Sequence, residues 1–492
     1  MTDIRPSEHV DVLIVGAGIS GIDAAYHLKT ECPGKSWLIL EARDAIGGTW
    51  DLFRYPGIRS DSDMYTLGFP FCPWRGEQSI ADGASIRDYV EETAREYAID
   101  RQIRFGHRVT KAAWSSDQAL WTVDVEVEGQ TLSFTCGFLF LCSGYYDYAQ
   151  GYRPKWPDEE SFRGRIVHPQ AWPEDMDVSG QRMVVIGSGA TAVTLVPALA
   201  EKAAHVTMLQ RSPSYIVSRP SRDALAHSLQ HWLPGRVADR LIRWKNVLLG
   251  IFFFNRARSQ PAKVKSAILK LAAESLPAGY DVDRHLSPKY DPWDQRLCLV
   301  PDGDLFEAVR SGNVSIATDS IERFTADGIL LKSGEVLPAD IVVTATGLVV
   351  KLLGGIALTV DGAPVNVAER FSYKGMMLND VPNLALSFGY TNASWTLKCD
   401  LTSRYVCRLL NHMDRFGHDI CVPRLPAGGF DRQPMLDFTS GYVARARDFL
   451  PSQGPLPPWR VHQNYVRDLL SFRFRAVTDE AMEFGKAGGG IG

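Results

Sequence analysis

The sequence predicts an α/β fold with two Rossmann-like dinucleotide-binding domains and a helical insertion. Three observations support this: a glycine-rich pattern at residues 10–21, a second copy that begins at Met183, and a change of composition between Pro220 and Pro292. In each copy a β-branched run ends in glycines, which is typical of a strand, a tight turn and a helix start. Two separate copies indicate two nucleotide sites in one chain.

The first copy has the spacing G-x-G-x-x-G, from Gly16 through Gly18 to Gly21. These glycines allow a tight turn, close approach of a pyrophosphate to the backbone, and close packing of helix on strand. A second strand is expected at residues 37–41, and Glu41 lies 20 residues after Gly21, where its carboxylate can accept hydrogen bonds from a ribose. We therefore expect a bound adenine dinucleotide. The alternative is a glycine turn that only packs a helix on a sheet.

The second copy reads G-x-G-x-x-A, from Gly187 through Gly189 to Ala192, and its strand at 205–210 ends without a carboxylate. Arg211 follows that strand. A guanidinium can pair with a ribose 2′-phosphate, which a carboxylate would repel. The first site is therefore expected to prefer FAD, and the second NADPH over NADH, with hydride passing from nicotinamide to flavin. The alternative for Arg211 is a surface arginine that caps a strand.

Composition excludes several other classes of protein. The chain has 492 residues and a formal net charge of -4, and 45% of its residues are hydrophobic, which is ordinary for a globular enzyme. No basic run is interleaved with aromatics, so nucleic acid is not expected as a partner. The eight cysteines form no C-x-x-C pair, so no metal site is expected and a reducing compartment is favoured. With no apolar signal stretch at the N-terminus, a cytoplasmic location is expected.

The most apolar run is Val247–Phe254, eight residues where a membrane span needs about 20. A buried helix is the expectation for it. Basic residues between 243 and 265 flank the run and leave open a weak peripheral membrane contact.

The two fingerprints and the composition change also predict a division into domains. The first domain is expected to be completed by the C-terminal part of the chain, and the glycine-rich end is expected to be disordered. The expected segments are an FAD-binding domain at 1–147 and 341–484, an NADP-binding domain at 148–218 and 290–340, a helical insertion at 219–289, and a disordered tail at 485–492.

Further motifs identify a family. Residues 162–173 match F-x-G-x-x-x-H-x-x-x-W-P, the signature of type I Baeyer–Villiger monooxygenases, through Phe162, Gly164, His168 and Trp172. Residues 47–61, GGTWDLFRYPGIRSD, match another signature of that family, and residues 340–347 match its D-x-x-x-x-A-T-G segment. The chain thus resembles this branch of the flavin-containing monooxygenases from about residue 9 to 470. Within it, the chain is most similar to the ethionamide-activating monooxygenases.

The resemblance implies an FAD- and NADPH-dependent monooxygenase. Such an enzyme inserts one oxygen atom from O2 next to a ketone carbonyl through a C4a-peroxyflavin, giving an ester or lactone, with sulfoxidation of sulfides as a second activity. It implies that Arg296 holds the peroxyflavin as an anion and that Asp61 positions this arginine. A fixed cation in a water-poor pocket stabilises a developing anion, and a buried cation needs a partner. The alternative is an ordinary ion pair in the domain interface.

Other residues receive weaker assignments from the same resemblance. Phe162, Gly164, His168 and Trp172 are interpreted as linker residues that couple domain rotation to cofactor handling, with a purely structural hinge as the alternative. Asn392 and Trp395 are candidates for a nicotinamide or substrate pocket. The further candidates for cofactor binding lie in or beside the motifs: Gly48, Thr49, Trp50, Asp61, Ser188, Thr191, Ser212, Thr346 and Gly347.

Two other functions stay open at this point. One is an N- or S-oxygenating flavin monooxygenase without a natural ketone substrate, and the other is a non-catalytic flavoprotein redox sensor. The motifs specify neither the individual substrate nor the oligomeric state.

Overall fold

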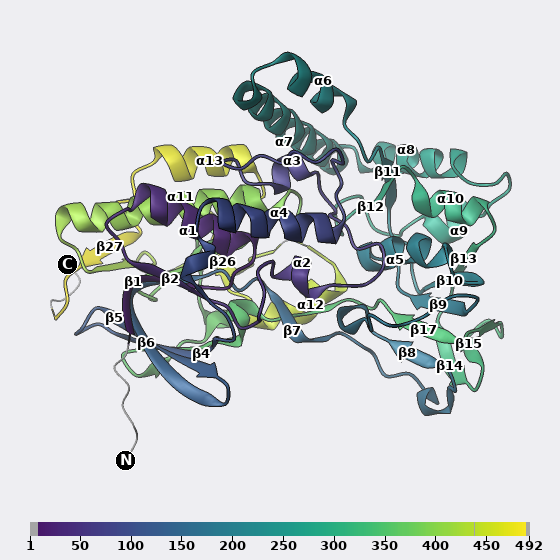
Figure 1. The fold of residues 1–492 in the computed structure, drawn as a ribbon, viewed down its shortest axis with the longest axis horizontal. Helices are drawn as coiled ribbons and strands as arrows, with labels where there is room; N and C mark the ends of the chain where they lie inside the picture. The colour runs from purple at the N-terminus through teal and green to yellow at the C-terminus, as the bar shows by residue number, and fades with distance from the viewer. Residues whose placement is uncertain (1–7, 437, 489–492) are drawn as a thin grey trace.

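Two sheets organise the chain, one built on each glycine fingerprint (Figure 1). The first is mixed, with parallel and antiparallel pairs, and the second is all parallel. A computed structural model of the protein describes residues 8–436 and 438–488. The expected α/β class with two Rossmann-like domains and a helical insertion is confirmed.

The N-terminal strand is an inner strand of the first sheet. Strand β1 (Glu8–Val15) pairs in parallel with β2 (Trp37–Leu40) and β6 (Gln130–Leu141). Val12, Leu13 and Ile14 of β1 are fully buried, as expected for a parallel strand covered on both faces. The remaining strands of this sheet are β3 (Ile103–Arg104), β4 (Arg108–Ser115), β5 (Leu120–Val127), β19 (Ala357–Val360), β20 (Ala363–Pro364) and β23 (Leu384–Leu386).

Helices from both ends of the chain cover this sheet. Helix α1 (Ile19–Glu31) follows the first fingerprint and packs against α11 (Trp395–Phe416), so the C-terminal part does complete the first domain. Helices α2 (Thr49–Leu52), α3 (Met64–Leu67), α4 (Gly83–Glu96), α12 (Gly441–Ala446) and α13 (Tyr465–Phe474) lie around them.

The second sheet is all parallel, in the order β13 (Val314–Thr318), β10 (His205–Gln210), β9 (Arg182–Ile186), β17 (Ile341–Thr344) and β8 (Arg165–Val167). Helices α5 (Ala190–Ala200) and α10 (Asp304–Arg310) pack on it. Strand β17 pairs with β9 and β8, which corrects the boundary expected at 340. The second domain extends through residue 344, because its sheet recruits one more strand before the chain returns.

Two antiparallel strands connect the domains. The chain leaves the first domain along β7 (Tyr146–Gly151) and returns along β18 (Leu348–Val350). A further parallel pair, β11 (Ile216–Arg219) and β12 (Cys298–Pro301), brackets the helical insertion, and an antiparallel sheet of β14 (Ile321–Thr325), β15 (Gly328–Leu331) and β16 (Val336–Pro338) extends the second domain.

The insertion contains α6 (Ala224–Trp232), α7 (Gly235–Ser259), α8 (Pro261–Glu274) and α9 (Val282–Leu286). The apolar run 247–254 lies within α7, but Leu248, Phe252 and Phe253 are exposed. The expectation of a buried helix is therefore wrong for one face. Within the described residues, none of the helices combines the length and the apolarity that crossing a membrane requires.

The C-terminal end differs in part from the expected disorder over 485–492. Gly485 closes strand β27 (Met482–Gly485), which pairs with β24 (Ile420–Pro423). Its backbone carbonyl accepts a hydrogen bond from Asp419, so this residue belongs to the folded domain. Residues 489–492 lie outside the described residues.

Candidate functional site

The first glycine loop has the geometry that a dinucleotide requires. Gly16 has φ +106°, and a Cβ on it would lie 2.7 Å from the Cys142 carbonyl oxygen, while a Cβ on Gly21 would lie 1.8 Å from the Gly16 oxygen. These two glycines are therefore needed by the fold itself. Gly18 is different, because a Cβ there would meet nothing closer than Gly48 Cα at 3.5 Å. The backbones of Gly18 and Gly48 thus form a cradle at the N-terminus of α1, where N–H groups can bind a phosphate.

Glu41 lies at the end of β2 beside this loop. Its two carboxylate oxygens accept hydrogen bonds from the backbone N–H groups of Ala17 (2.7 Å) and Arg43 (2.9 Å), and the side chain is buried. The carboxylate is therefore fixed next to the cradle, with lone pairs left for ribose hydroxyls. The cradle and this acceptor fit the adenosine diphosphate part of FAD.

The motif 47–61 connects the first domain to the second. At its start, the Tyr148 hydroxyl lies over Gly48 and hydrogen-bonds Thr49, and burial raises the pKa of Tyr148 to about 12. Trp50 follows in α2 and is half-buried against the main core. At Gly57, φ is +75° and a Cβ would lie 2.8 Å from the Thr194 carbonyl oxygen, so this loop packs directly on α5.

The second glycine loop resembles the first, with one glycine that the fold requires and one that lies beside open space. Gly187 has φ +145° and a Cβ on it would lie 2.3 Å from the Ala345 oxygen, whereas a Cβ on Gly189 would meet nothing within 4 Å. Space for a ligand therefore lies over Gly189, at the N-terminus of α5. Ser188 donates a hydrogen bond to the Ser212 carbonyl (2.9 Å) and thereby ties the glycine loop to the end of β10.

Arg211 and Thr191 lie beside this second glycine loop. Arg211 is exposed and has no ion pair with any described residue, so its guanidinium is free for an external phosphate. Thr191 hydrogen-bonds Tyr55, whose pKa burial raises to about 12. Tyr55 belongs to the motif 47–61, and this contact joins that motif to the helix of the second fingerprint.

Arg296 and Asp61, 235 positions apart in the sequence, form an ion pair with Nη2 and Oδ1 3.0 Å apart. Burial lowers the pKa of Arg296, but Asp61 and the hydroxyls of Tyr145 and Tyr442 outweigh this effect and raise it, so the guanidinium stays charged. About a third of its side chain is accessible, at 32%, and Arg296 is one of the residues that line a cavity. The cavity is lined by Tyr145, Arg296, Val350, Phe388, Tyr390, Thr391, Trp395, Leu436, Tyr442, Val443 and Leu450.

The aromatic wall of this cavity reaches the first glycine loop. Trp395 stacks on Tyr145 with ring centroids 5.1 Å apart, and its indole N–H donates to Ser20 Oγ at 2.9 Å. Ser20 lies between Gly18 and Gly21, so Trp395 links the cavity to the FAD cradle. The candidate Asn392 does not line the cavity: its amide donates to the Gln463 carbonyl, and Thr391 lines the cavity in its place.

Tyr145 and Tyr146 are site residues that sequence reasoning missed. Their hydroxyls hydrogen-bond each other, and both lie in the field of Arg296. They lie four and five residues after Leu141, the last residue of β6, beyond the carboxyl end of a strand that pairs in parallel with β1. Ligands commonly bind at such ends, and this was the signal available in the sequence.

The residues of the signature 162–173 lie away from the cavity. The ring of Phe162 is in the core of the second domain, and Gly164 leaves room for it, since a Cβ there would be 2.5 Å from that ring. His168 packs against Gly151 of the connecting strand β7, where a Cβ would be 1.9 Å from its ring, and burial lowers the pKa of His168. Trp172 is half-buried against the same domain. The contacts show packing alone, so the linker role of these residues stays a prediction beside the structural hinge.

The last two candidates hold the connecting strands together. Thr346 donates to the Tyr152 carbonyl at 2.6 Å, and the Gly347 carbonyl accepts from the Tyr152 N–H at 3.0 Å. Arg445 lies over the Tyr152 ring, 3.5 Å from its centroid. This group fixes the crossover between the two nucleotide sites.

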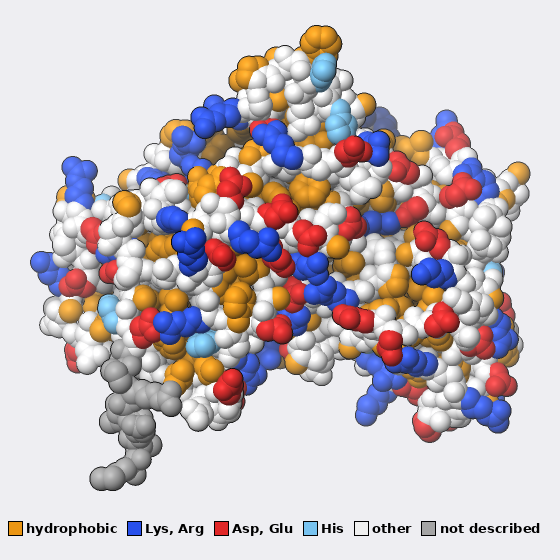
Figure 2. Space-filling view, in the orientation of Figure 1, with side chains coloured by type: hydrophobic (Ala, Val, Ile, Leu, Met, Phe, Trp, Pro, Cys, Tyr) orange, Lys and Arg blue, Asp and Glu red, His pale blue; other side chains and the backbone are white. Residues whose placement is uncertain are grey.

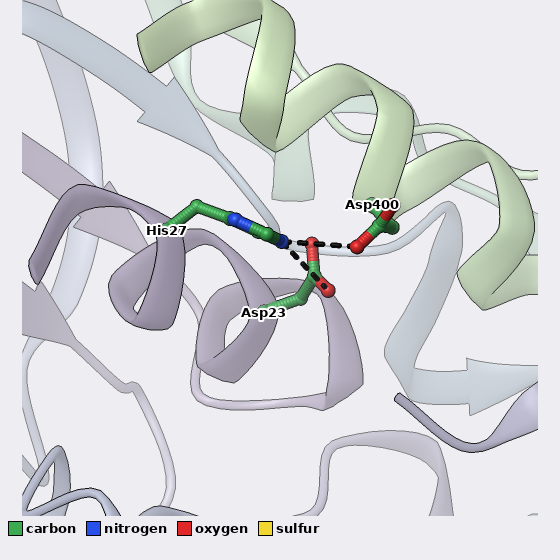
Figure 3. A group of neighbouring side chains, drawn as sticks. All are labelled: Asp23, His27 and Asp400. Carbon is green, nitrogen blue, oxygen red and sulfur yellow. Dashed lines mark hydrogen bonds and ion pairs between the residues drawn. The ribbon is translucent and has the colours of Figure 1, made fainter. Parts of the chain in front are cut away.

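A separate cluster of ionisable groups is buried between α1 and α11 (Figure 3). Three carboxylates surround the ring of His27: Nε2 is 3.0 Å from Asp400 and 3.9 Å from Asp23, while Nδ1 is 2.9 Å from Glu31. Burial lowers the pKa of His27, but the bonds to Asp400 and Glu31 raise it to about 9. Burial raises the pKa of Asp23 to about 7. Asp23, His27 and Asp400 are close enough to share a metal ion. However, an imidazolium that donates a hydrogen bond from each ring nitrogen has no lone pair left to coordinate a metal.

Comparison with known proteins agrees with this geometry. A family model described as Flavin-binding monooxygenase-like matches residues 78–352, and one described as NAD(P)-binding Rossmann-like domain matches residues 14–71. The FAD-containing monooxygenase EthA of Mycobacterium tuberculosis is 55% identical over 99% of this chain and 100% of its own. The putative FAD-containing monooxygenase MymA of the same organism is 48% identical, with 98% of each chain covered.

Solved structures share the fold at low sequence identity. A steroid monooxygenase bound to NADP matches with a TM-score of 0.75 at 20% identity, covering 97% of this chain and 100% of that one. A cyclohexanone monooxygenase in an open form matches with a TM-score of 0.76 at 19% identity, covering 98% and 100%. The identity and coverage of the relatives, together with the family model that spans more than half of the sequence, place the chain in the flavin-binding monooxygenase family.

Proposed function

We propose that this flavin-dependent monooxygenase inserts one oxygen atom of O2 next to a ketone carbonyl and releases an ester or lactone. FAD and NADP(H) are its cofactors. The observation that supports the proposal is the Arg296–Asp61 pair facing an aromatic cavity that reaches the FAD cradle. Bound FAD, once reduced by NADPH, supplies the activated oxygen.

In this proposal Arg296 is the group that distinguishes ketone oxidation from the mere leakage of electrons to O2. Its charge is fixed, because a guanidinium does not lose its proton, and Asp61 fixes its direction. A permanently charged donor in a cavity with apolar walls stabilises an anion that develops there. Tyr145 and Trp395, whose rings stack on each other, contribute to the largely apolar lining of the same cavity.

The two nucleotide sites assign the cofactors within this proposal. The Gly18–Gly48 cradle and Glu41 would hold FAD, and Gly189, Thr191 and Arg211 would hold NADPH. The phosphate of NADPH would pair with Arg211, which is exposed and free of any ion pair with the described residues.

Oxygenation of sulfides is a second activity that the cavity favours. Most of its lining is aromatic or aliphatic, and a soft, apolar sulfide fits such walls as well as a ketone does. The relatives at 48–55% identity are FAD-containing monooxygenases, whereas the cyclohexanone monooxygenase neighbour is only 19% identical. Product analysis distinguishes the two substrate classes.

One experiment separates the functions. NADPH consumption is measured with and without a panel of ketones and sulfides, while products are identified by mass and hydrogen peroxide is quantified. An ester at one equivalent per NADPH supports the proposal. Sulfoxide without any ester makes the protein an S-oxygenase, and NADPH oxidation that yields only peroxide with every compound removes both oxygenase activities.

A further inference from the structure

Helix α7 presents an apolar stripe to solvent. Helices α6 and α7 rise as a hairpin from one side of the molecule (Figure 1). On the outer side of α7, apolar residues repeat at helical spacing, and 39–60% of each is exposed. With a rise of 1.5 Å per residue, this stripe is about 22 Å long. It consists of Val237, Leu241, Trp244, Leu248 and Phe252, with Leu249 and Phe253 exposed beside it.

The opposite face of α7 is already occupied. Val247 packs with Tyr390 and Leu397, and Phe254 contacts Trp293 with ring centroids 5.6 Å apart. Arg258 is paired with Asp294 on the loop that leads to Arg296. The helix is therefore held in one orientation. On its second apolar face, Trp244 contacts Tyr465 with ring centroids 5.9 Å apart, while Leu241, Leu248 and Phe252 are about half exposed or more. A set of large apolar side chains exposed together marks an interaction surface.

Charge indicates what covers this surface. Residues 224–274 contain nine Lys and Arg against two Asp and Glu, a net charge of +7 in a chain whose total is -4, so the remaining residues sum to -11. Four of these cations are exposed and have no ion pair with a described residue: Arg236, Arg240, Arg256 and Lys263. Figure 2 shows hydrophobic side chains at the crest of the hairpin and blue side chains below it.

We infer that the outer face of α7 binds the surface of an anionic lipid bilayer. A helix that lies in the membrane interface places Trp, Phe and Leu among the acyl chains and its cations at the headgroups, which is the arrangement found here. A second copy of the chain is a poorer partner, because the two +7 segments would face each other across a twofold interface. The inference concerns this surface alone and does not depend on the reaction in the cavity.

The test is sedimentation of the FAD-loaded protein with vesicles of phosphatidylcholine alone or mixed with phosphatidylglycerol. Wild type should pellet with the anionic vesicles, weakly with the neutral ones, and less at high salt. The variant Leu241→Ser/Leu248→Ser/Phe252→Ser should lower the partition coefficient on anionic vesicles tenfold or more. Replacing Arg236, Arg240, Arg256 and Lys263 by Gln should lower binding to anionic vesicles and leave neutral ones unaffected.

A matched control removes similar exposed apolar side chains elsewhere. Val336→Ser/Phe416→Ser/Leu456→Ser, at residues that are 53–66% exposed, should bind vesicles like wild type. All variants should keep full flavin content and NADPH-dependent flavin reduction, which shows that they fold. Equal binding of wild type to both kinds of vesicle, equal loss in the control, or a wild-type dimer that the α7 variant dissociates would each overturn the inference.

Discussion

The sharpest consequence of the site concerns Arg296→Ala. An anion about 4 Å from the guanidinium gains about 4 kcal/mol at an effective dielectric constant of ~20. Arg296 is one-third accessible, so solvent screening reduces this to about 3 kcal/mol, the usual effect of one well-placed donor. The variant should therefore form ester roughly 100-fold more slowly.

The assay for this variant follows NADPH, dissolved oxygen, ester and peroxide in the same reaction. FAD content and flavin reduction by NADPH should stay near wild type, because neither glycine loop contacts Arg296, while hydrogen peroxide replaces the ester. Arg296→Lys keeps the charge but loses the planar guanidinium. It should form more ester per NADPH consumed than Arg296→Ala does, but less than wild type. Ester formation by Arg296→Ala at near the wild-type rate would refute the reasoning and leave an ordinary interface ion pair.

Three further predictions follow from other parts of the structure. Gly189→Val should fold and keep its flavin, because a Cβ at this position meets nothing within 4 Å, but NADPH should no longer reduce that flavin. Gly18→Val should lose the flavin itself. Normal kinetics with NADPH in Gly189→Val would place the nicotinamide cofactor elsewhere. Arg211→Ala should raise the KM for NADPH roughly thirtyfold, a loss of about 2 kcal/mol, and leave that for NADH unchanged; equal changes would contradict the assignment. Since folding raises the pKa of His27 to about 9 and that of Asp23 to about 7, the native state binds more protons than the unfolded one. The stabilising contribution of these two groups is full at acidic pH and is lost as pH rises through 7 and 9. His27→Gln should therefore flatten the fall of Tm between pH 6.5 and 9. An unchanged slope of Tm against pH would contradict the role of the cluster.

The local parts of this architecture could be predicted from sequence. Gly16 and Gly187 have positive φ at the turns expected for them, and β10 spans the predicted residues 205–210. Such features depend on residues that are neighbours in the chain. The role predicted for Gly16, the tight turn, was incomplete, because its missing Cβ also makes room for the Cys142 carbonyl.

Features that depend on distant partners could not be predicted in the same way. The cluster around His27 needs Asp400, which is 373 positions away, and no local pattern announces it. The strand at 341–344 looks like any apolar strand, and only its pairing with β9 assigns it to the second domain. Asn392 and Thr391 are adjacent polar residues that both hydrogen-bond the distant Gln463, and no local pattern indicates that Thr391 is the one that lines the cavity.

Oxygen transfer to a ketone is the central claim, and isotope labelling tests it most directly. The enzyme is supplied with NADPH and a ketone under 18O2, and the ester is analysed by mass. The account predicts one labelled oxygen in the ester for each NADPH consumed. NADPH oxidation that yields only labelled hydrogen peroxide, with the ketone recovered unchanged, would contradict it.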